Sequence, residues 1–171
     1  EGRHHDGLMW SIDSECVIGI EAKVSESFDR SIKDRIEAAK KNYDQGENTK
    51  KRILESIRVI KGEINQSTDW LNENEDLMYQ LLSATIGTVI DAKKLGATKA
   101  VFLVIEFTGN VCKEKKYDIN VDKNRKDFDY YMEFLGLDQK DDKGRNIDVD
   151  GINVWFKKLS INIGKSEYSV E

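Results

Sequence analysis

A helical pattern that runs into a nearly continuous apolar strand is the feature that most restricts the fold of this chain. Residues 76–95 carry apolar side chains at helical spacing and are followed by Gly96, a residue type that commonly ends helices. Residues 99–107 (KAVFLVIEF) are almost all apolar, as is typical of a central strand covered on both faces. We therefore expect an α/β fold, in which this strand joins an earlier strand in parallel through crossover helices.

The earlier strand is predicted at residues 17–24 (VIGIEAKV), where Glu21 and Lys23 interrupt an apolar run. Successive strand side chains point to opposite faces, so these two residues share one face. The alternate residues should then form the core side: Ile18, Ile20, Ala22 and Val24. An acid and a base at the end of an apolar strand are costly to bury. A divalent metal would explain the pair, because a carboxylate can bind the ion while an ammonium steers the attacking water.

A β-hairpin is predicted just before this strand. Residues 8–12 form a strand pattern, residues 13–15 (DSE) are turn formers, and the next strand begins at Cys16. The hairpin would bring Asp6 beside Glu21.

This arrangement, an acid on one strand followed by Glu21-Ala22-Lys23 on the next, resembles the PD-(D/E)XK nuclease superfamily. Residues 21–28 (EAKVSESF), 79–82 (YQLL) and 95–101 (LGATKAV) look like a little-characterised bacterial branch of it. The resemblance covers most of residues 6–107. It implies a restriction-endonuclease-like core, with a mixed central sheet flanked by helices, and the activity of a metal-dependent nuclease.

The resemblance also implies a metal site. Asp6, Glu21 and the carbonyl of Ala22 would hold Mg²⁺ (or Mn²⁺), and Lys23 would orient water or stabilise charge on the phosphate.

Two further side chains are candidates for the same site. Glu26 could replace an acid that the superfamily often carries on a helix before the first strand, or it could anchor Lys23. Gln80 could reach the site from the helix that follows.

The sequence departs from the superfamily pattern in two respects. The usual Pro-Asp is absent, since the chain has no proline. The upstream acid has no counterpart except Glu1, unless a segment outside these residues supplies it. His4 and His5 are either native or left from a tag.

Each assignment has a plainer alternative. Asp6 precedes Gly7, and Asp-Gly is a common turn pair. Glu21 and Lys23 could be a solvent-facing pair on a half-exposed strand. Glu26 could be an exposed or capping acid, and Gln80 could lie on a helix surface.

Composition restricts the class of protein. At 171 residues the chain is expected to be a single domain, with a core at about 6–107 and an extension over 108–171. No apolar run is long enough to cross a bilayer, and two cysteines are too few for a disulfide scaffold, so we expect a cytoplasmic protein. The net charge of −5 is unusual for a nucleic-acid protein, although there are local lysine and arginine clusters.

The remaining elements are predicted less sharply. A helix should follow a cap at residues 25–27, with Phe28 facing inward, and residues 67–75 should form a loop or short turn. Residues 122–137 read as a helix and 138–150 as a polar loop. Residues 151–163 read as one or two strands, with a bulge where the apolar phase slips after Phe156.

Three functions are compatible with these observations. The first is a metal-dependent nuclease with nucleic acid, preferentially DNA, as its partner. The second is a binding module with the same fold and an inactive site. The third is an acidic protein-binding partner of the inhibitor or immunity type. A homodimer is compatible with the first, since nucleases that cut both strands are commonly dimers.

Overall fold

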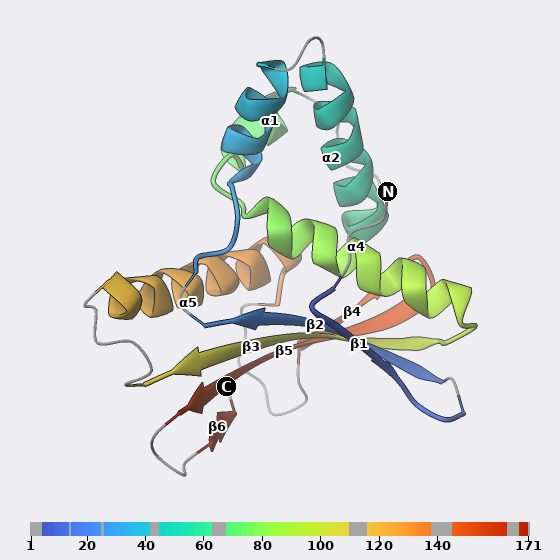
Figure 1. The fold of residues 1–171 in the computed structure, drawn as a ribbon. Helices are drawn as coiled ribbons and strands as arrows, with labels where there is room; N and C mark the ends of the chain where they lie inside the picture. The colour runs from blue at the N-terminus through green and yellow to red at the C-terminus, as the bar shows by residue number, and fades with distance from the viewer. Residues whose placement is uncertain are drawn as a thin grey trace.

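A mixed β-sheet with helices stacked on one side forms the molecule (Figure 1). The computed structural model describes residues 5–13, 15–24, 26–41, 45–62, 68–109, 116–137, 145–163 and 168–170. The sheet has the strand order β1-β2-β3-β5-β4, and β6 pairs with β5. The predicted α/β class, a mixed sheet flanked by helices, is confirmed at this level.

The sheet begins with the predicted hairpin. Strands β1 (Gly7–Trp10) and β2 (Cys16–Lys23) are antiparallel, with Gly7 opposite Ile20. In the turn between them, the hydroxyl of Ser11 donates a hydrogen bond to Asp13 at 2.5 Å. A short polar turn of this kind keeps the two strands in register.

The centre of the sheet is parallel. Strand β3 (Lys99–Thr108) pairs in parallel with β2 on one side and with β5 (Ile152–Asn162) on the other. The carboxyl ends of these three strands therefore lie at one edge, the edge where open α/β sheets commonly bind ligands. The remaining strands, β4 (Arg145–Val149) and β6 (Tyr168–Val170), run antiparallel to β5.

Two helices cover the sheet directly, α4 (Tyr79–Lys94) and α5 (Lys116–Leu135) (Figure 1). Beyond α4 lie α1 (Ile32–Lys40), α2 (Gln45–Lys61) and the short α3 (Thr68–Glu73). After α4, Gly96 adopts a φ of +71°, the left-handed conformation predicted for a helix stop.

The core lies between the sheet and these helices. Apolar side chains from every layer are buried there, including Phe28, Ile32, Ile53, Ile57, Leu77, Leu81, Leu82, Phe102, Val104, Tyr131, Met132, Val154 and Phe156. Aromatic rings of β3, β5 and α5 meet edge to face, with the Phe102 and Phe156 centroids 6.2 Å apart. Such packing fixes the helices against one face of the sheet.

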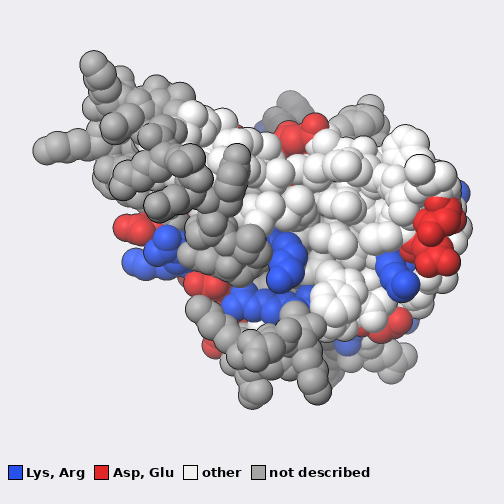
Figure 2. Space-filling model, turned by 90° about the horizontal axis from the view of Figure 1, so that it is seen from below, with Lys and Arg blue, Asp and Glu red and all other residues white. Residues whose placement is uncertain are grey.

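The opposite face of the sheet corrects two predictions. Residues 99–107 were expected to be covered on both faces, yet Val101, Leu103 and Ile105 are only partly buried. The same holds for Ile18 and Ile20, which were expected on the core side of β2. The described helices lie on the other side, and Figure 2, the view from below, shows mostly uncharged residues on this face.

Three further predictions are wrong in detail. Residues 67–75 were expected to be a loop or short turn but contain the six-residue helix α3, and β4 lies within the predicted loop 138–150. The first helix begins at Ile32, where the hydroxyl of Ser31 accepts a hydrogen bond from the N–H of Asp34, not at residues 25–27. Phe28 therefore precedes the helix.

The predicted bulge after Phe156 is also wrong. Strand β5 pairs with β3 without interruption from Asn153 to Asn162. The apolar phase slips because Lys158, a charged residue, occupies a position on the helix-covered face.

Residues 110–115 and 138–144 lie outside the described part of the chain. No helix within the described ranges has the length and apolar character that a membrane span requires.

Candidate functional site

Glu21 and Lys23 lie on the face of β2 that the helices cover. Their side chains are buried, with exposed fractions of 2% and 4% for the whole residues. The Lys23 ammonium donates a hydrogen bond to Glu21 Oε1 at 3.0 Å. The plainer alternative of a solvent-facing pair is therefore wrong, because both charges are inside the protein and neutralise each other there.

Asp6 lies beside this pair across the hairpin. Its Oδ2 accepts a hydrogen bond from the N–H of Ala22 at 2.8 Å, and the side chain is exposed. The contact follows from the strand register, since Gly7 is the partner of Ile20 and Asp6 is one residue further along. The hairpin thus brings the Asp6 carboxylate to the residue that separates Glu21 from Lys23, as predicted.

Gln80 joins the site from the first turn of α4. Its Nε2 donates a hydrogen bond to Glu21 Oε1, and its Oε1 accepts one from the N–H of Asp29 at 2.9 Å. The side chain is buried, so it is not on the helix surface. A residue so placed can fix the orientation of the Glu21 carboxylate.

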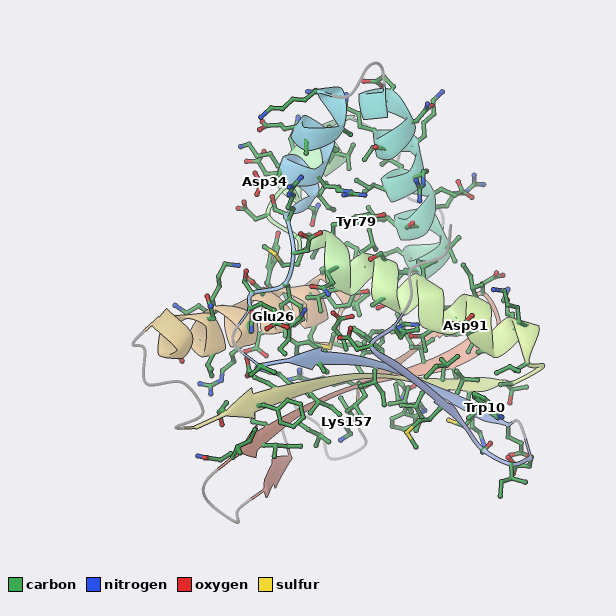
Figure 3. All side chains as sticks on the ribbon, in the orientation of Figure 1. Trp10, Glu26, Asp34, Tyr79, Asp91 and Lys157 are labelled. Carbon is green, nitrogen blue, oxygen red and sulfur yellow. The ribbon has the colours of Figure 1, made fainter. Side chains whose placement is uncertain are left out.

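Glu26 is the candidate residue that lies at the edge of the site. Its side chain is exposed, and its Oε2 accepts a hydrogen bond from the N–H of Val24 at 3.4 Å. Figure 3 shows it in the segment that leaves the end of β2. The geometry resembles a local turn contact more than a direct contribution to the buried pair.

A second acid–base pair lies next to the first and was missed from the sequence. Glu106 of β3 and Lys158 of β5 are 2% and 4% exposed, and Lys158 Nζ lies 3.0 Å from Glu106 Oε2. Strand register places Glu106 beside Lys23, and Lys158 is level with Val104. Four charges that sum to zero therefore extend across three parallel strands.

Asn124 of α5 completes this second pair. Its Nδ2 donates hydrogen bonds to Glu106 Oε1 and to the carbonyl of Glu26, both at 3.1 Å. Its Oδ1 accepts one from the N–H of Phe28 at 3.2 Å. One signal for these residues was present in the sequence: Glu106 interrupts an apolar strand, as Glu21 and Lys23 do in theirs. The position of Asn124 could be found only from the packing of α5.

The 26–29 segment covers the site. Phe28 is fully buried, and the Lys23 ammonium lies 5.6 Å from the centre of its ring, within the range of a cation–π contact. Just after the segment, the N–H of Tyr79 donates a hydrogen bond to the carbonyl of Arg30 at 3.0 Å, which ties the chain there to the start of α4. The buried charges are thus enclosed by strands, two helices and this segment.

The residues that the resemblance assigns to a metal have suitable chemistry. Asp6, Glu21 and the carbonyl of Ala22 offer oxygen atoms, which Mg²⁺ and Mn²⁺ prefer. The hydrogen bond from Ala22 to Asp6 places the Asp6 carboxylate, just before β1, beside the residue that follows Glu21. Magnesium is commonly held by one or two carboxylates with water and phosphate completing its shell. In the described part of the chain, no group of three or more His, Cys, Asp or Glu residues could hold an ion.

His5 belongs to the fold, at some distance along α4 from this site. Its side chain is 2% exposed, and its Nε2 lies 3.4 Å from the hydroxyl of Thr88 and 4.0 Å from Asp91. Figure 3 shows Asp91 at the far end of α4 from Tyr79. Gly19 lies beneath His5 and Thr88, where a larger residue would not fit. His4 is outside the described residues.

Comparison with known proteins gives one match. A family model described as a domain of unknown function, DUF6946, matches residues 2–163. No curated protein and no solved structure matches the chain.

Proposed function

The chain belongs to the DUF6946 family, and we propose that it is a metal-dependent nuclease that hydrolyses phosphodiester bonds, with DNA as the favoured substrate. The observation that carries this proposal is the buried Glu21–Lys23 pair with the Asp6 carboxylate hydrogen-bonded to Ala22 between them. An acid and an ammonium held together at the carboxyl end of a parallel strand suit phosphate chemistry better than a purely structural role.

The fold supports the proposal through its connectivity. A hairpin, a group of helices and a strand parallel to the second hairpin strand follow one another in β1, β2, α4 and β3. This is the order expected of a restriction-endonuclease-like core over residues 6–107. In that interpretation β4, β5 and β6 widen the sheet as an extension.

The proposed roles follow from the contacts. Asp6, Glu21 and the Ala22 carbonyl would hold Mg²⁺ or Mn²⁺, which when bound polarises the phosphate and acidifies water. Lys23 supplies an ammonium beside Glu21, where it can orient a water molecule or balance negative charge developing on a phosphate. Gln80 keeps the Glu21 carboxylate in one orientation.

The second candidate function is a binding module with the same fold. One observation favours it: Glu21 and Lys23 are bound to each other and almost completely buried. A site that has lost its activity could retain such a pair as a structural element. Nucleic acid would then bind without being cut.

A cleavage assay separates the two candidates. The protein would be incubated with supercoiled and linear DNA in Mg²⁺, in Mn²⁺ and in EDTA, beside Lys23→Ala. The matched control is Lys33→Ala, which removes a lysine from a surface ion pair with Glu75. The proposal requires cleavage that depends on metal, is lost in Lys23→Ala and remains in Lys33→Ala. DNA binding without cleavage by the folded protein would support the binding module instead.

A further inference from the structure

Two side-chain amides make the same pattern of contacts on either side of the site. Gln80 of α4 donates to Glu21 and accepts from the N–H of Asp29. Asn124 of α5 donates to Glu106 and accepts from the N–H of Phe28. Two helices are thus connected to two buried glutamates and to two consecutive backbone N–H groups.

Both patterns meet in the 26–29 segment. Asn124 also donates to the carbonyl of Glu26, so it holds this segment at two points. The buried side-chain amide of Asn124 thus makes three hydrogen bonds within the protein, as buried polar groups generally must. The loss of Asn124 would leave the N–H of Phe28 and an oxygen of Glu106 without these bonds.

The 26–29 segment separates Lys23 from solvent. Lys23 is 4% exposed, and the Phe28 ring packs against its ammonium. A phosphate could not reach the ammonium in this arrangement, so a nuclease built on this site needs the segment to move. Loops that close over active sites and open again are common in enzymes.

We propose that the 26–29 segment is a movable cover over Lys23, and that Asn124, held by the Glu106–Lys158 pair, is the positioning residue that keeps it closed. The need for opening rests on the proposed nuclease function, whereas the closing contacts do not. The chain of contacts runs from Lys158 of β5 through Glu106 and Asn124 to Phe28. These contacts link β5 to Phe28, the residue whose ring packs on Lys23.

The accessibility of Lys23 tests the proposal directly. The folded protein would be labelled briefly with an amine-reactive acetyl ester, and the rate at Lys23 would be measured by peptide mass spectrometry relative to the exposed Lys33. Asn124→Ala should raise this ratio at least tenfold while most of the structure is retained. Thr85→Val is the matched control, because it removes the buried 2.7 Å hydrogen bond from Tyr131, also between α4 and α5, without touching the cover.

The outcomes are distinct. A ratio in folded Asn124→Ala within twofold of wild type, or an equal rise in Thr85→Val, would overturn the proposal. If Asn124→Ala does not fold, Asn124→Leu keeps a similar shape, adds no charge beside Glu106 and removes the N–H donors, with the same rise expected. Hydrogen exchange of the wild type adds a test without mutation, since the amides of Phe28 and Asp29 should exchange faster than those of β2. Equal protection would also overturn the proposal. None of these readouts needs DNA or metal, so a failed cleavage assay leaves them valid.

Discussion

Lys23 of β2 and Glu106 of β3 are register partners in the parallel sheet, and both side chains are buried on the face that the helices cover. Each belongs to a different ion pair, so the charges alternate from Glu21 to Lys23, Glu106 and Lys158. An interior row of this kind is stable only while every charge has its partner.

Removing one charge of the second pair should destabilise the protein strongly. Glu106→Gln and Lys158→Met should each lower the free energy of unfolding by about 3–5 kcal/mol, because the remaining charge stays buried without its partner. The double variant should recover most of that loss. Urea denaturation of the four proteins gives the interaction energy.

The surface pair Lys33–Glu75 is the matched control for that cycle. Both side chains are more than a third exposed, so the same substitutions there should cost about 0–1 kcal/mol. Equal losses of unfolding free energy at the two pairs would contradict the prediction that the buried pair contributes more to stability than the surface pair.

Gly19→Ala should destabilise the contact between β2 and α4. A Cβ at this position would overlap the hydroxyl of Thr88 and lie 2.9 Å from Cε1 of His5. We expect a loss of about 1–3 kcal/mol in thermal or urea unfolding, since overpacking a close contact forces its neighbours to shift. Thr88→Ala in the same protein should restore part of the loss. Gly7→Ala is the control, because its Cβ would meet only ordinary contacts with Ile20.

Gln80→Met should weaken the proposed chemistry more than the fold. The variant keeps the volume of the side chain but loses its bonds to Glu21 and to the N–H of Asp29. Partners that orient a metal-binding carboxylate are commonly worth 10–100-fold in metal affinity or activity, and we expect an effect of about that size. Ile90→Ala, on the exposed side of α4, should leave cleavage unchanged. Cleavage by Gln80→Met at the wild-type rate would show that Gln80 does not contribute to the proposed chemistry.

Tyr131 should make stability fall at alkaline pH. Its burial raises the pKa of the phenol well above the value of about 10 in an unfolded chain, and the hydrogen bond to Thr85 opposes this only partly. The stabilising contribution is therefore complete below about pH 10 and is lost as the pH rises further, because the unfolded state releases the proton first. Tyr131→Phe should show a shallower fall of the urea midpoint between pH 9 and 11. Parallel curves would contradict this.

The main elements were predictable because local patterns are strong in them. The apolar run of β3, the helix before it and its stop at Gly96 could each be recognised from neighbouring residues. The hairpin was also predictable from its turn residues. The family resemblance, the nuclease function, the metal and the DNA partner stay predictions.

Which face of β2 packs against the helices was not predictable from the alternation of its side chains alone. Ile18 and Ile20 are more apolar than Glu21 and Lys23, so hydrophobicity pointed to the wrong side. The buried charges are stabilised by each other and by a partner far away in sequence, Gln80, which alternation does not reveal. Lys158 was missed for the same reason, because its partner Glu106 lies on another strand. A charged residue at a buried position then made a continuous strand look like a strand with a bulge.

The start of the first helix shows a different limit. Ser25 to Ser27 offered cap residues, but Ser31 caps the helix instead. The N–H groups of Phe28 and Asp29, before the helix, donate to the side-chain amides of Asn124 in α5 and Gln80 in α4. These contacts depend on how the helices pack, so the local sequence does not predict them. Phe28 is therefore part of the cover and not of the helix.

Binding of Mn²⁺ measured by titration calorimetry tests the central claim, that Asp6 and Glu21 form a divalent metal site. The wild type should bind Mn²⁺, whereas Asp6→Asn and Glu21→Gln should bind at least tenfold more weakly. The control Asp34→Asn changes an exposed acid on α1, away from the site in Figure 3, and should bind as the wild type does. Absent binding in the folded wild type, or equal binding in all four proteins, would contradict the proposed metal site.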